Sequence, residues 1–570
     1  MLFGNLLLAF LALLSLSCVE SLHITPEIAD DHLRSAYDYI VVGGGTAGLT
    51  IANRLSENFA AGPPNLSIPG GLLPVPGTIG SGGWQKYQWG LTSEPQTYLN
   101  GQNVGIPQGR AVAAHGYNGS VHVSYPRYFY DQSSNVLEVF AELGLPIIGD
   151  VNNGTAAGAM ILPSSMDPDN QTRFDAREAH FNSASHRYNL HIATNQTVTQ
   201  LILDSHGGYN SSRRVVGVEV ERSVNQCLQF AQDEKSKTRT IYCNQEVIIS
   251  AGAVFSPTLL QVSGIGPSDV LKSLDIPVKI DLPGVGYNLQ DHPMVYANYY
   301  YRNSSYFRSD EIVDDVYDEV AREYIQNRTG ELKQMYKSSA NGIPSTAPSS
   351  VQKGYRMQKE ILKEQILRND TGIFEMMANS WGQLTVAAQK TFSRGTVRPS
   401  TSSMFDQPVI DPRYCSDPID CETIVLGLQL NTKLINTKAM RELMPEPESA
   451  FDTADGKTLM RQVMNKITTE RHPSGTAAMM PLDLGGVVDS ELRVYGTCNL
   501  RVADASIIPI IPSAHLQARV YAIAEKVSFS LDMKQRVISD NRFRLQTWLS
   551  RPGWIAVLAQ DFLYLPRFDR

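Results

Sequence analysis

The stretch YDYIVVGGGTAGLTIANRLSEN, residues 37–58, constrains the fold of this chain more than any other part of the sequence. An apolar run leads into Gly43, Gly45 and Gly48, and the residues that follow have helical spacing. This pattern indicates a buried strand, a GxGxxG turn and a helix, and such glycines allow backbone N–H groups to approach a pyrophosphate. The stretch therefore predicts a dinucleotide site in an α/β fold. A coincidental turn is the alternative, and the choice between NAD and FAD is open at this point.

The length and charge of the chain limit what else it can be. With 570 residues it can bury a large core, and it is long enough for two or more intertwined domains. Its net charge of -8 gives no basic surface for nucleic acid, so no nucleic-acid partner is expected. The expected partner is a small molecule.

The N-terminus, MLFGNLLLAFLALLSLSCVES, is an apolar run that ends in small residues. It lacks a basic n-region, but it is short and terminal, so residues 1–21 are interpreted as a signal peptide rather than a membrane span. We therefore expect a mature chain that starts near Leu22, is secreted or lies in the lumen of the secretory pathway, and has no integral membrane span. Nine Asn-x-Ser/Thr sequons agree with secretory passage. They are at Asn65, Asn118, Asn153, Asn170, Asn195, Asn210, Asn303, Asn327 and Asn369.

The cysteines make two local disulfides plausible. Cys227 and Cys243 flank a polar linker between strand-like runs, and Cys415 and Cys421 lie in a loop rich in proline and aspartate. Cys498 is left over and is expected to be a buried thiol at the entrance to a strand. No His/Cys cluster has zinc spacing, so no metal site is expected.

Two histidines stand in stretches that suggest a function. In ERHPSGTAAMMP, residues 470–481, a proline follows His472 and favours extended backbone there, so this histidine is expected on a stiff, non-helical segment. A structural histidine at a turn and a catalytic histidine explain this stretch equally well. His515, in IPSAHLQAR, directly precedes a predicted helix, and on its own it is better explained as a helix-start residue without a special role.

Six motifs in order along the chain resemble the glucose-methanol-choline (GMC) oxidoreductases, and within them the fungal aryl-alcohol-oxidase-like and secondary-metabolite branch. The resemblance is collinear from about residue 36 to 527. The motifs are DYIVVGGGTAGLTIANRLSEN (38–58), SAGAVFSPTLLQVSGIGP (250–267), LPGVGYNLQDHP (282–293), SRGTVRP (393–399), ERHPSGTAAM (470–479) and LRVADASIIPIIPSAHLQARVYAIAEK (500–526).

The resemblance implies a two-lobed α/β (α+β) fold, with a Rossmann-type FAD-binding lobe and an antiparallel-sheet substrate lobe. It implies an N-terminal FAD-binding region at 36–293, a substrate-lobe insert at 294–380, a C-terminal region with the histidines at 381–530 and an atypical tail at 531–570. Periodicity agrees, because it predicts strands in NLHIATNQTVTQLILD, RVVGVEVER and NQEVIISAGA. It also predicts helices at 311–327, 352–368 and 418–440.

The resemblance further implies FAD as cofactor and oxidation of a small-molecule alcohol, aromatic or polyketide-derived, to the aldehyde or ketone. Oxygen or a quinone would be the electron acceptor. His472 matches the family's catalytic base, and His515 matches its partner on the substrate oxygen; neutral histidine suits proton removal near physiological pH. The cofactor-binding residues that the resemblance implies are Gly43, Gly45, Thr46, Ala47, Gly48, Val198, Asp504 and Ala505. Two of them have an alternative explanation: Asp504 could be a turn or cap residue, and Val198 could be plain strand core.

The chain departs from the family pattern at two places. After Asn58 it reads NFAAGPPNLSIPGG, which contains neither a second apolar strand nor the carboxylate expected about 20 residues after the glycines to hold the ribose. After IPQGRAV, residues 106–112, the Gly-Gly-Ser-Ser segment that lies against the flavin in the family is missing. Both gaps have family-like flanks, which indicates clean deletions or misassigned exons.

These departures predict the family fold with weak FAD binding. They also keep open the alternative of a degenerate relative that has lost the redox reaction. The tail contains WLSRPGWIAVLAQDFLYLPRF, residues 548–568, which is apolar enough to pack on the body of the protein or on a partner.

Overall fold

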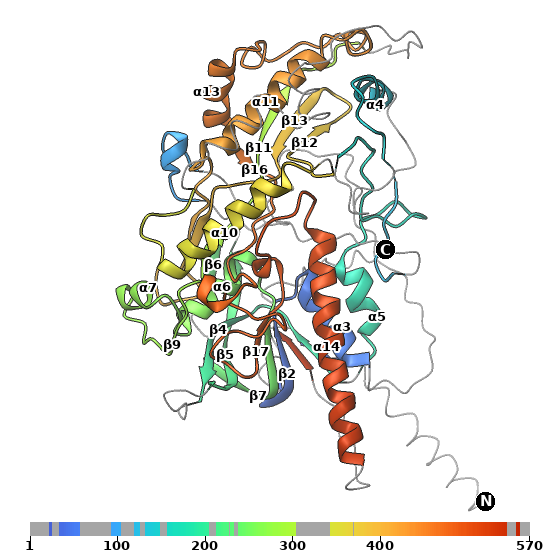
Figure 1. The fold of residues 1–570 in the computed structure, drawn as a ribbon. Coiled ribbons are helices and arrows are strands. Elements are labelled where there is room, and N and C mark those ends of the chain that lie inside the picture. The colour runs from blue at the N-terminus through green and yellow to red at the C-terminus, as the bar shows by residue number, and fades with distance from the viewer. Residues whose placement is uncertain are drawn as a thin grey trace, which may run out of the picture.

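The fold is taken from a computed structural model of the chain, which has a large mixed sheet at one end and a smaller antiparallel sheet at the other (Figure 1). No helix among the described residues is long and apolar enough to cross a membrane. The described residues are 22–24, 33–57, 93–103, 119–125, 132–148, 157–187, 189–204, 212–226, 229–232, 237–303, 342–368, 370–543 and 555–558.

The large sheet has nine strands among the described residues, in the order β1-β3-β18-β2-β7-β5-β4, with β17 beside β7 and β6 beside β5. Six of them, β1, β3, β18, β2, β7 and β17, pair in parallel, whereas β4, β5 and β6 pair antiparallel. The strand bounds are β1 Leu22–Ile24, β2 Ala36–Val42, β3 Leu190–Ala193, β4 Gln196–Leu203, β5 Val215–Gln226, β6 Gln229–Gln232, β7 Arg239–Ile249, β17 Leu500–Val502 and β18 Ile555–Leu558.

Helices cover this sheet as expected for buried parallel strands. α3 (Thr46–Ser56) follows β2 directly, and α14 (Gln517–Phe543) packs along it, joined by an ion pair of 2.9 Å between Arg54 and Glu525 (Figure 1). α6 (Gly252–Val262) follows β7 and has only apolar or hydrogen-bonded side chains in its buried face. The largest hydrophobic core lies between these helices and the sheet.

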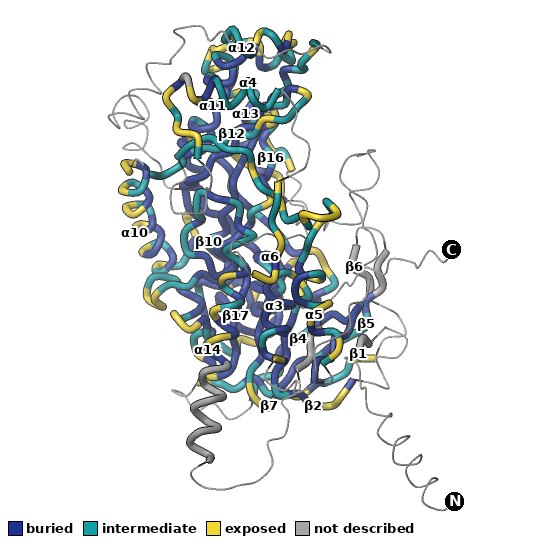
Figure 2. Tube along the Cα trace, turned by 90° about the vertical axis from the view of Figure 1, so that its right-hand side faces the viewer, coloured by how far each residue is buried: buried dark blue, intermediate teal, exposed yellow. Residues whose placement is uncertain are grey.

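The smaller sheet is antiparallel, in the order β12-β13-β11-β16. Its strands are β12 Phe374–Ala378, β13 Gln383–Ala388, β11 Pro293–Asn298 and β16 Thr468–Thr469. α11 (Pro418–Leu434) and α13 (Gly456–Lys466) pack with it around a second core. Buried residues are found in both sheet regions and between them (Figure 2).

Short strands and helices complete the described part of the chain. The remaining strands are β8 Ile265–Gly266, β9 Ile280–Asp281, β10 Tyr287–Leu289, β14 Gly395–Arg398 and β15 Val409–Asp411. The remaining helices and turns are η3 Thr97–Leu99, α4 Gln132–Glu142, η4 Arg177–Phe181, α5 Asn182–Ala184, α7 Ser268–Ser273, α10 Ser349–Gln365, α12 Lys438–Arg441, η5 Leu482–Leu484 and η6 Ala505–Ile507.

The predicted strand–turn–helix at the glycines is confirmed by β2 and α3, and the three predicted strand runs by β3, β4, β5 and β7. The helices predicted at 352–368 and 418–440 are confirmed by α10 and by α11 with α12. The predicted helix at 311–327 and the two sequence gaps, after Asn58 and after 106–112, lie outside the described residues.

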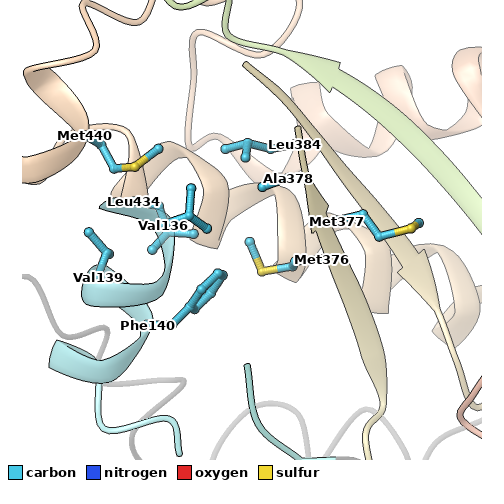
Figure 3. A pocket seen from close by; sticks show the side chains of 9 residues that line it. All are labelled: Val136, Val139, Phe140, Met376, Met377, Ala378, Leu384, Leu434 and Met440. Carbon is cyan, nitrogen blue, oxygen red and sulfur yellow. The ribbon is translucent and has the colours of Figure 1, made fainter. Parts of the chain in front are cut away.

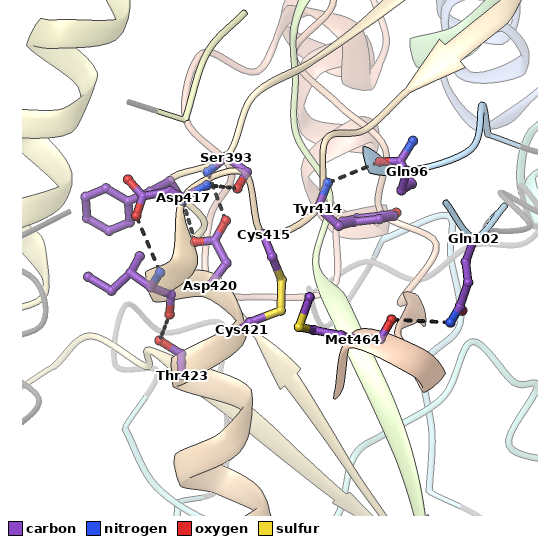
Figure 4. The surroundings of a disulfide bond; sticks show 12 residues. Gln96, Gln102, Ser393, Tyr414, Cys415, Asp417, Asp420, Cys421, Thr423 and Met464 are labelled. Atoms are coloured by element: carbon purple, nitrogen blue, oxygen red, sulfur yellow. Dashed lines mark hydrogen bonds between the residues drawn. A yellow bond between two sulfur atoms is a disulfide. The ribbon is translucent and has the colours of Figure 1, made fainter. Parts of the chain in front are cut away.

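One of the two predicted disulfides is confirmed. Cys415 and Cys421 are bonded and close the loop before α11 (Figure 4). Cys243 is a free, buried thiol, so its predicted pairing with Cys227 is wrong. The register explains this: Tyr242 lies opposite Gly217, near the start of β5, whereas Cys227 follows the other end of that strand and is outside the described residues.

Cys498 corrects a further expectation. It was expected to be a buried thiol, but it is exposed. The next residue, Asn499, is the buried one: its side chain hydrogen-bonds to Val215 and to the carbonyl oxygen of Gln245. The strand entrance is therefore held by an amide rather than by a packed thiol.

Candidate active site

The glycine turn lies at the carboxyl end of β2. Gly43 has a φ of +115°, and a Cβ there would lie 2.3 Å from the carbonyl oxygen of Ser250. A Cβ on Gly48 would lie 1.9 Å from the carbonyl oxygen of Gly43. The close packing of the turn therefore requires glycine at both positions.

Gly45 has no such contact. It is the N-cap of α3, and a Cβ on it would meet nothing within 4 Å. Thr46 and Ala47 follow as the first helical residues, and the first turn has no acidic side chain. This open helix N-terminus fits the pyrophosphate of FAD, because free backbone N–H groups and the helix dipole attract negative charge.

Asp504 is buried at the carboxyl end of β17. Its Oδ2 accepts hydrogen bonds from the backbone N–H of Gly252 at 2.9 Å and from the hydroxyl of Ser256 at 2.5 Å, and its Oδ1 accepts one from the N–H of Ser506 at 2.8 Å. The carboxylate therefore caps α6 and the turn η6, which is the turn-or-cap role given above as the alternative. Its cofactor-binding role stays a prediction.

Backbone contacts connect the glycine turn to the histidine loop. The N–H of Ser250 donates to the carbonyl oxygen of Val42, and the hydroxyl of Ser250 donates to that of Ala503. Two residues further on, the carbonyl oxygen of Ala505 accepts from the N–H of Gly475, in the loop of His472. The carboxyl ends of β2, β7 and β17 and the histidine loop thus adjoin one another.

Val198 lies in β4, opposite Val220, and is buried in the largest core. This burial gives it the strand-core role that the sequence left as an alternative. Through Val220 it lies level with Arg239, the first residue of β7. Its cofactor-binding role stays a prediction.

His472 is held by its backbone on a non-helical segment, as predicted. Its N–H donates to Oδ1 of Asp291 at 2.9 Å, and the N–H of His292 donates to the same oxygen at 2.9 Å. Arg471, just before it, has a φ of +69°, which is rare for a residue with a side chain. The ring of His472 lies 5.2 Å from that of His515, between ring centroids. The two predicted catalytic residues therefore meet, although 43 positions separate them in sequence.

The disulfide loop supports the same aspartate. The hydroxyl groups of Tyr414 and Thr469 both donate to Oδ2 of Asp291. Tyr414 precedes Cys415, and the bond from Cys415 to Cys421 fixes the loop that carries it (Figure 4). Asp291 thereby joins the disulfide loop, the start of β11 and the histidine loop.

A buried carboxylate, Glu470, lies at the centre of the histidines. Its Oε2 is 3.2 Å from Nδ1 of His292 and 3.7 Å from Nδ1 of His472, and its Oε1 is 3.3 Å from Nε2 of His515. Nε2 of His515 is also 3.1 Å from Oε1 of Glu375, in β12. The two Nδ1 atoms of His292 and His472 are 3.0 Å apart. We call these five residues the histidine–carboxylate cluster; its ligand atoms form two sets, each within 4.8 Å, which is close enough to share a cation.

The cluster fixes the charges of its members. Burial would raise the pKa of Glu470, but hydrogen bonds from His292, His472 and His515 hold it well below its usual value. Burial would lower the pKa of His515, but its hydrogen bonds to Glu375 and Glu470 outweigh this and raise the pKa to about 10. Burial lowers the pKa of His292 in spite of Glu470. At neutral pH the cluster thus contains the Glu470 anion, a His515 cation and a neutral His292.

This arrangement leaves one nitrogen of each catalytic candidate for a substrate. Nδ1 of His472 faces His292 and Glu470, so Nε2 remains as a proton acceptor. Nε2 of His515 faces the carboxylates, so the second N–H of its imidazolium remains as a hydrogen-bond donor. In such a pair the base can take the proton of a hydroxyl group, while the cationic donor stabilises the negative charge that remains on the oxygen.

The predicted site residues did not include Glu470, Glu375, His292 or Asp291. Three of them stand inside quoted motifs, ERHP and LQDHP, but a motif does not show that two loops 180 residues apart face each other. Glu375 stands in β12 with no local signal. On a strand, Glu375 and Met377 point to one side and Met376 to the other, and this alternation is the only signal in the sequence for the direction of Glu375.

An apolar pocket lies beside this part of the small sheet. Met376 points into it, while Met377 points to the other side of β12 (Figure 3). Since side chains alternate along a strand, Glu375 belongs to the side of Met377, away from the centre of the pocket. The pocket is lined by Val136, Val139, Phe140, Met376, Met377, Ala378, Leu384, Leu434 and Met440.

Comparisons with known proteins agree with this geometry. Two sequence models of the family described as GMC oxidoreductase match residues 112–294 and 391–524, more than half of the chain. The GMC oxidoreductase family protein Mala s 12 of Malassezia sympodialis is 27% identical over 86% of this chain and 91% of its own length. Dehydrogenase xptC of Emericella nidulans is 28% identical over 87% of this chain and 92% of its own length.

A solved structure agrees as well. That of an FAD-dependent oxidoreductase from Chaetomium thermophilum superposes with a TM-score of 0.73 at 26% identity, over 88% of this chain and 100% of the other. The mixed α/β fold, with a parallel-strand lobe and antiparallel sheets, is therefore the one predicted from the six motifs.

Proposed function

Since the chain belongs to the GMC oxidoreductase family, whose members bind FAD, we propose that it oxidises the CH–OH group of an alcohol to the aldehyde or ketone. The proposed substrate is an aromatic or polyketide-derived alcohol, with oxygen or a quinone as electron acceptor. A role in fungal secondary metabolism is proposed because the six motifs resemble that branch of the family, and the similar proteins include a fungal dehydrogenase, xptC.

The observation that carries this proposal is the pairing of His472 and His515 around the buried Glu470. Hydride removal from an alcohol carbon needs a base for the hydroxyl proton, and a positioned base contributes about 10²- to 10⁴-fold to the rate. We assign proton removal to Nε2 of His472. The cationic His515 donates a hydrogen bond to the substrate oxygen, and Glu470 with Glu375 keeps it charged.

The chain offers residues to hold FAD at the edge where these histidines lie. The N-terminus of α3, opened by Gly45, would hold the pyrophosphate, and the backbone at Asp504–Ala505 would lie between it and the histidine loop. FAD, when bound, supplies the hydride acceptor, and the protein supplies position, charge and proton transfer.

Replacing each histidine tests the assignment of roles. His472→Ala should reduce alcohol-dependent flavin reduction by about 10²- to 10⁴-fold. His515→Ala should reduce it less, because water replaces a hydrogen-bond donor more easily than a base. Both variants should keep their fold and their flavin content. His186→Ala, at an exposed histidine far from the cluster in sequence, is the matched control and should reduce flavin at the wild-type rate.

The rate of flavin reduction should be measured by anaerobic stopped-flow absorbance over a range of pH. A wild-type rate in His472→Ala would overturn the assignment. If the wild-type protein binds flavin but none of the tested alcohols reduces that flavin, the result would support the alternative of a relative that has lost the redox reaction.

A further inference from the structure

The small sheet turns one of its faces towards the histidine–carboxylate cluster. Residues that lie directly opposite one another in an antiparallel sheet share a face, so Glu375, Ala387 and Met294 form one row across β12, β13 and β11. Glu375 carries the hydrogen bond to His515, which places this row against the cluster. The other face of the sheet packs on α11 and α13 in the second core.

The next row on the same face contains a partly exposed tyrosine. It consists of Met377, Thr385 and Tyr296, two residues or about 7 Å along the strands from the first row. Thr385 is buried, whereas Tyr296 is 39% exposed, and the hydroxyl of Tyr296 has no hydrogen-bond partner in the part of the chain that the structure describes. This hydroxyl is therefore available as a donor to a bound molecule.

A cationic side chain stands directly before the proposed base. Arg471 is exposed, and no acidic side chain among the described residues forms an ion pair with it. Its φ of +69° is costly for a residue with a side chain, and its N–H donates to the hydroxyl of Thr469 at 2.7 Å. Backbone strain of this kind is concentrated at active sites and ligand clamps. The turn leaves the Arg471 side chain exposed, whereas the side chain of His472 is only 13% exposed.

The tyrosine and the arginine lie within electrostatic range of each other. Burial raises the pKa of Tyr296, the charge of Arg471 opposes this rise, and the charge of Glu470 adds to it. Tyr296 consequently keeps its proton near neutral pH and can donate it to an acceptor. Two donors of different kinds, a cationic guanidinium and a neutral phenol, thus stand next to the proposed base.

We propose that Arg471 and Tyr296 recognise an anionic group of the substrate, and that the substrate is an aromatic alcohol with an acidic substituent such as a carboxylate. Arginine is always charged and its planar fork matches a carboxylate. Glu375 and Glu470 would repel such a group, but both bond to the cationic His515, whereas Arg471 has no acid to compensate it. This inference rests on the proposed function, because it names the substrate class of the same site.

The first test compares two alcohols that differ in charge and hardly in shape, para-(hydroxymethyl)benzoate and para-(hydroxymethyl)benzamide. The kcat/KM of wild type should be about ten- to a hundredfold higher for the benzoate, as expected for a hydrogen bond to a charged group. The difference should lie in KM rather than kcat, because the carboxylate is remote from the carbon that is oxidised.

Variants assign this preference to the two residues. Arg471→Gln should bring the ratio of the two kcat/KM values close to one, and Arg471→Lys should retain part of the preference. Tyr296→Phe should lower the ratio less than Arg471→Gln does. Arg461→Gln, at another exposed arginine, is the matched control and should keep the wild-type ratio. An equal loss of kcat for both alcohols in Arg471→Gln would overturn the inference, because the residue would then only hold the loop of His472.

The second test needs no turnover. Calorimetric titration of the full-length protein with para-toluate and para-toluamide, which have no hydroxyl group, measures anion binding alone. Arg471→Gln should bind para-toluate about ten- to a hundredfold more weakly than wild type does. If wild type oxidises alcohols but shows no preference for the benzoate, and para-toluate binds equally to both proteins, this inference fails and the proposed function stands. If wild type oxidises no alcohol, the proposed function fails, and equal binding of para-toluate to both proteins would overturn the anion site as well.

Discussion

At the scale of single residues, the histidine–carboxylate cluster explains how one site holds a base and a cation side by side. Without other charges, two adjacent histidines would both be mostly neutral at pH 7, because the unperturbed pKa is about 6.5 and like charges repel each other. Glu470 removes this difficulty, because one of its oxygens faces His515 and the other faces His292 and His472. The charge of His515 is thus favoured by the two carboxylates, although its side chain is 39% exposed and water screens part of their effect.

This account predicts the effect of Glu470→Gln on stability. His515 has a folded pKa of about 10, above the unfolded value of about 6.5, so its contribution is complete below pH 6.5 and is lost as the pH rises towards 10. Glu470 has a lowered folded pKa, so its contribution is complete above about pH 4.3 and is lost as the pH falls. The difference in stability between wild type and Glu470→Gln should therefore be largest between these limits, at roughly 1 to 3 kcal/mol.

Melting temperature measured from pH 4 to about pH 10 tests this prediction. Glu446→Gln is the matched control, because Glu446 pairs with Arg302 on the surface and should show a small difference at every pH. A difference for Glu470→Gln that does not change with pH would mean that the cluster acts only by packing.

At the scale of elements, the site is assembled where loops from both sheets meet. Asp291 connects the entry to β11, the histidine loop and the loop closed by the disulfide. Asp417 and Asp420 then hold the start of α11, where the backbone N–H groups of Phe392 and Ser393 donate to Asp420 (Figure 4). Burial and the nearby Asp417 raise the pKa of Asp420 to about 7.

Replacing both Cys415 and Cys421 by serine should destabilise the protein by about 2 kcal/mol, the chain-entropy value for so short a loop. Equilibrium unfolding in urea measures the loss. Cys498→Ser, which removes an exposed free thiol, is the control and should change stability by less than about 0.5 kcal/mol. Native protein in which Cys415 and Cys421 both react with a thiol reagent would contradict the disulfide.

Much of the element structure follows from local patterns in the sequence. The turn at Gly43 and Gly48 is predictable because steric contact allows no side chain there, and α11 because its apolar spacing follows a proline start. Glu470 was not predictable as the centre of the cluster, since its role depends on His292 and His515 from distant segments. The same holds for β18, because four apolar residues do not indicate which sheet they will join.

At the scale of the whole molecule, a strand from the C-terminal tail, β18, lies inside the large sheet between β2 and β3. Passage of the chain to the outside of the cell stays a prediction. We propose that it passes through the secretory pathway and loses residues 1–21. β1 begins at Leu22, the expected start of the mature chain, and pairs with β3.

Two of the sequons are expected to differ in glycosylation. Asn170 is exposed and its Oδ1 accepts hydrogen bonds from Thr172, which leaves the amide nitrogen free for a glycan. The amide nitrogen of Asn303 donates to the carbonyl oxygen of Glu442. Mass spectrometry after enzymatic deglycosylation should therefore find Asn170 modified and Asn303 unmodified, and N-terminal sequencing should find a start near Leu22. Recovery of Met1 with no mass shift on deglycosylation would refute secretion.

The visible absorption spectrum of the purified chain, recorded before and after anaerobic addition of aromatic primary alcohols, tests the central claim most directly. The account predicts the bands of oxidised FAD, bleached by at least one such alcohol in wild type and in His186→Ala, and unbleached on the same timescale in His472→Ala. A protein that purifies without flavin and binds none when FAD is added, or that is bleached equally fast without His472, would contradict it.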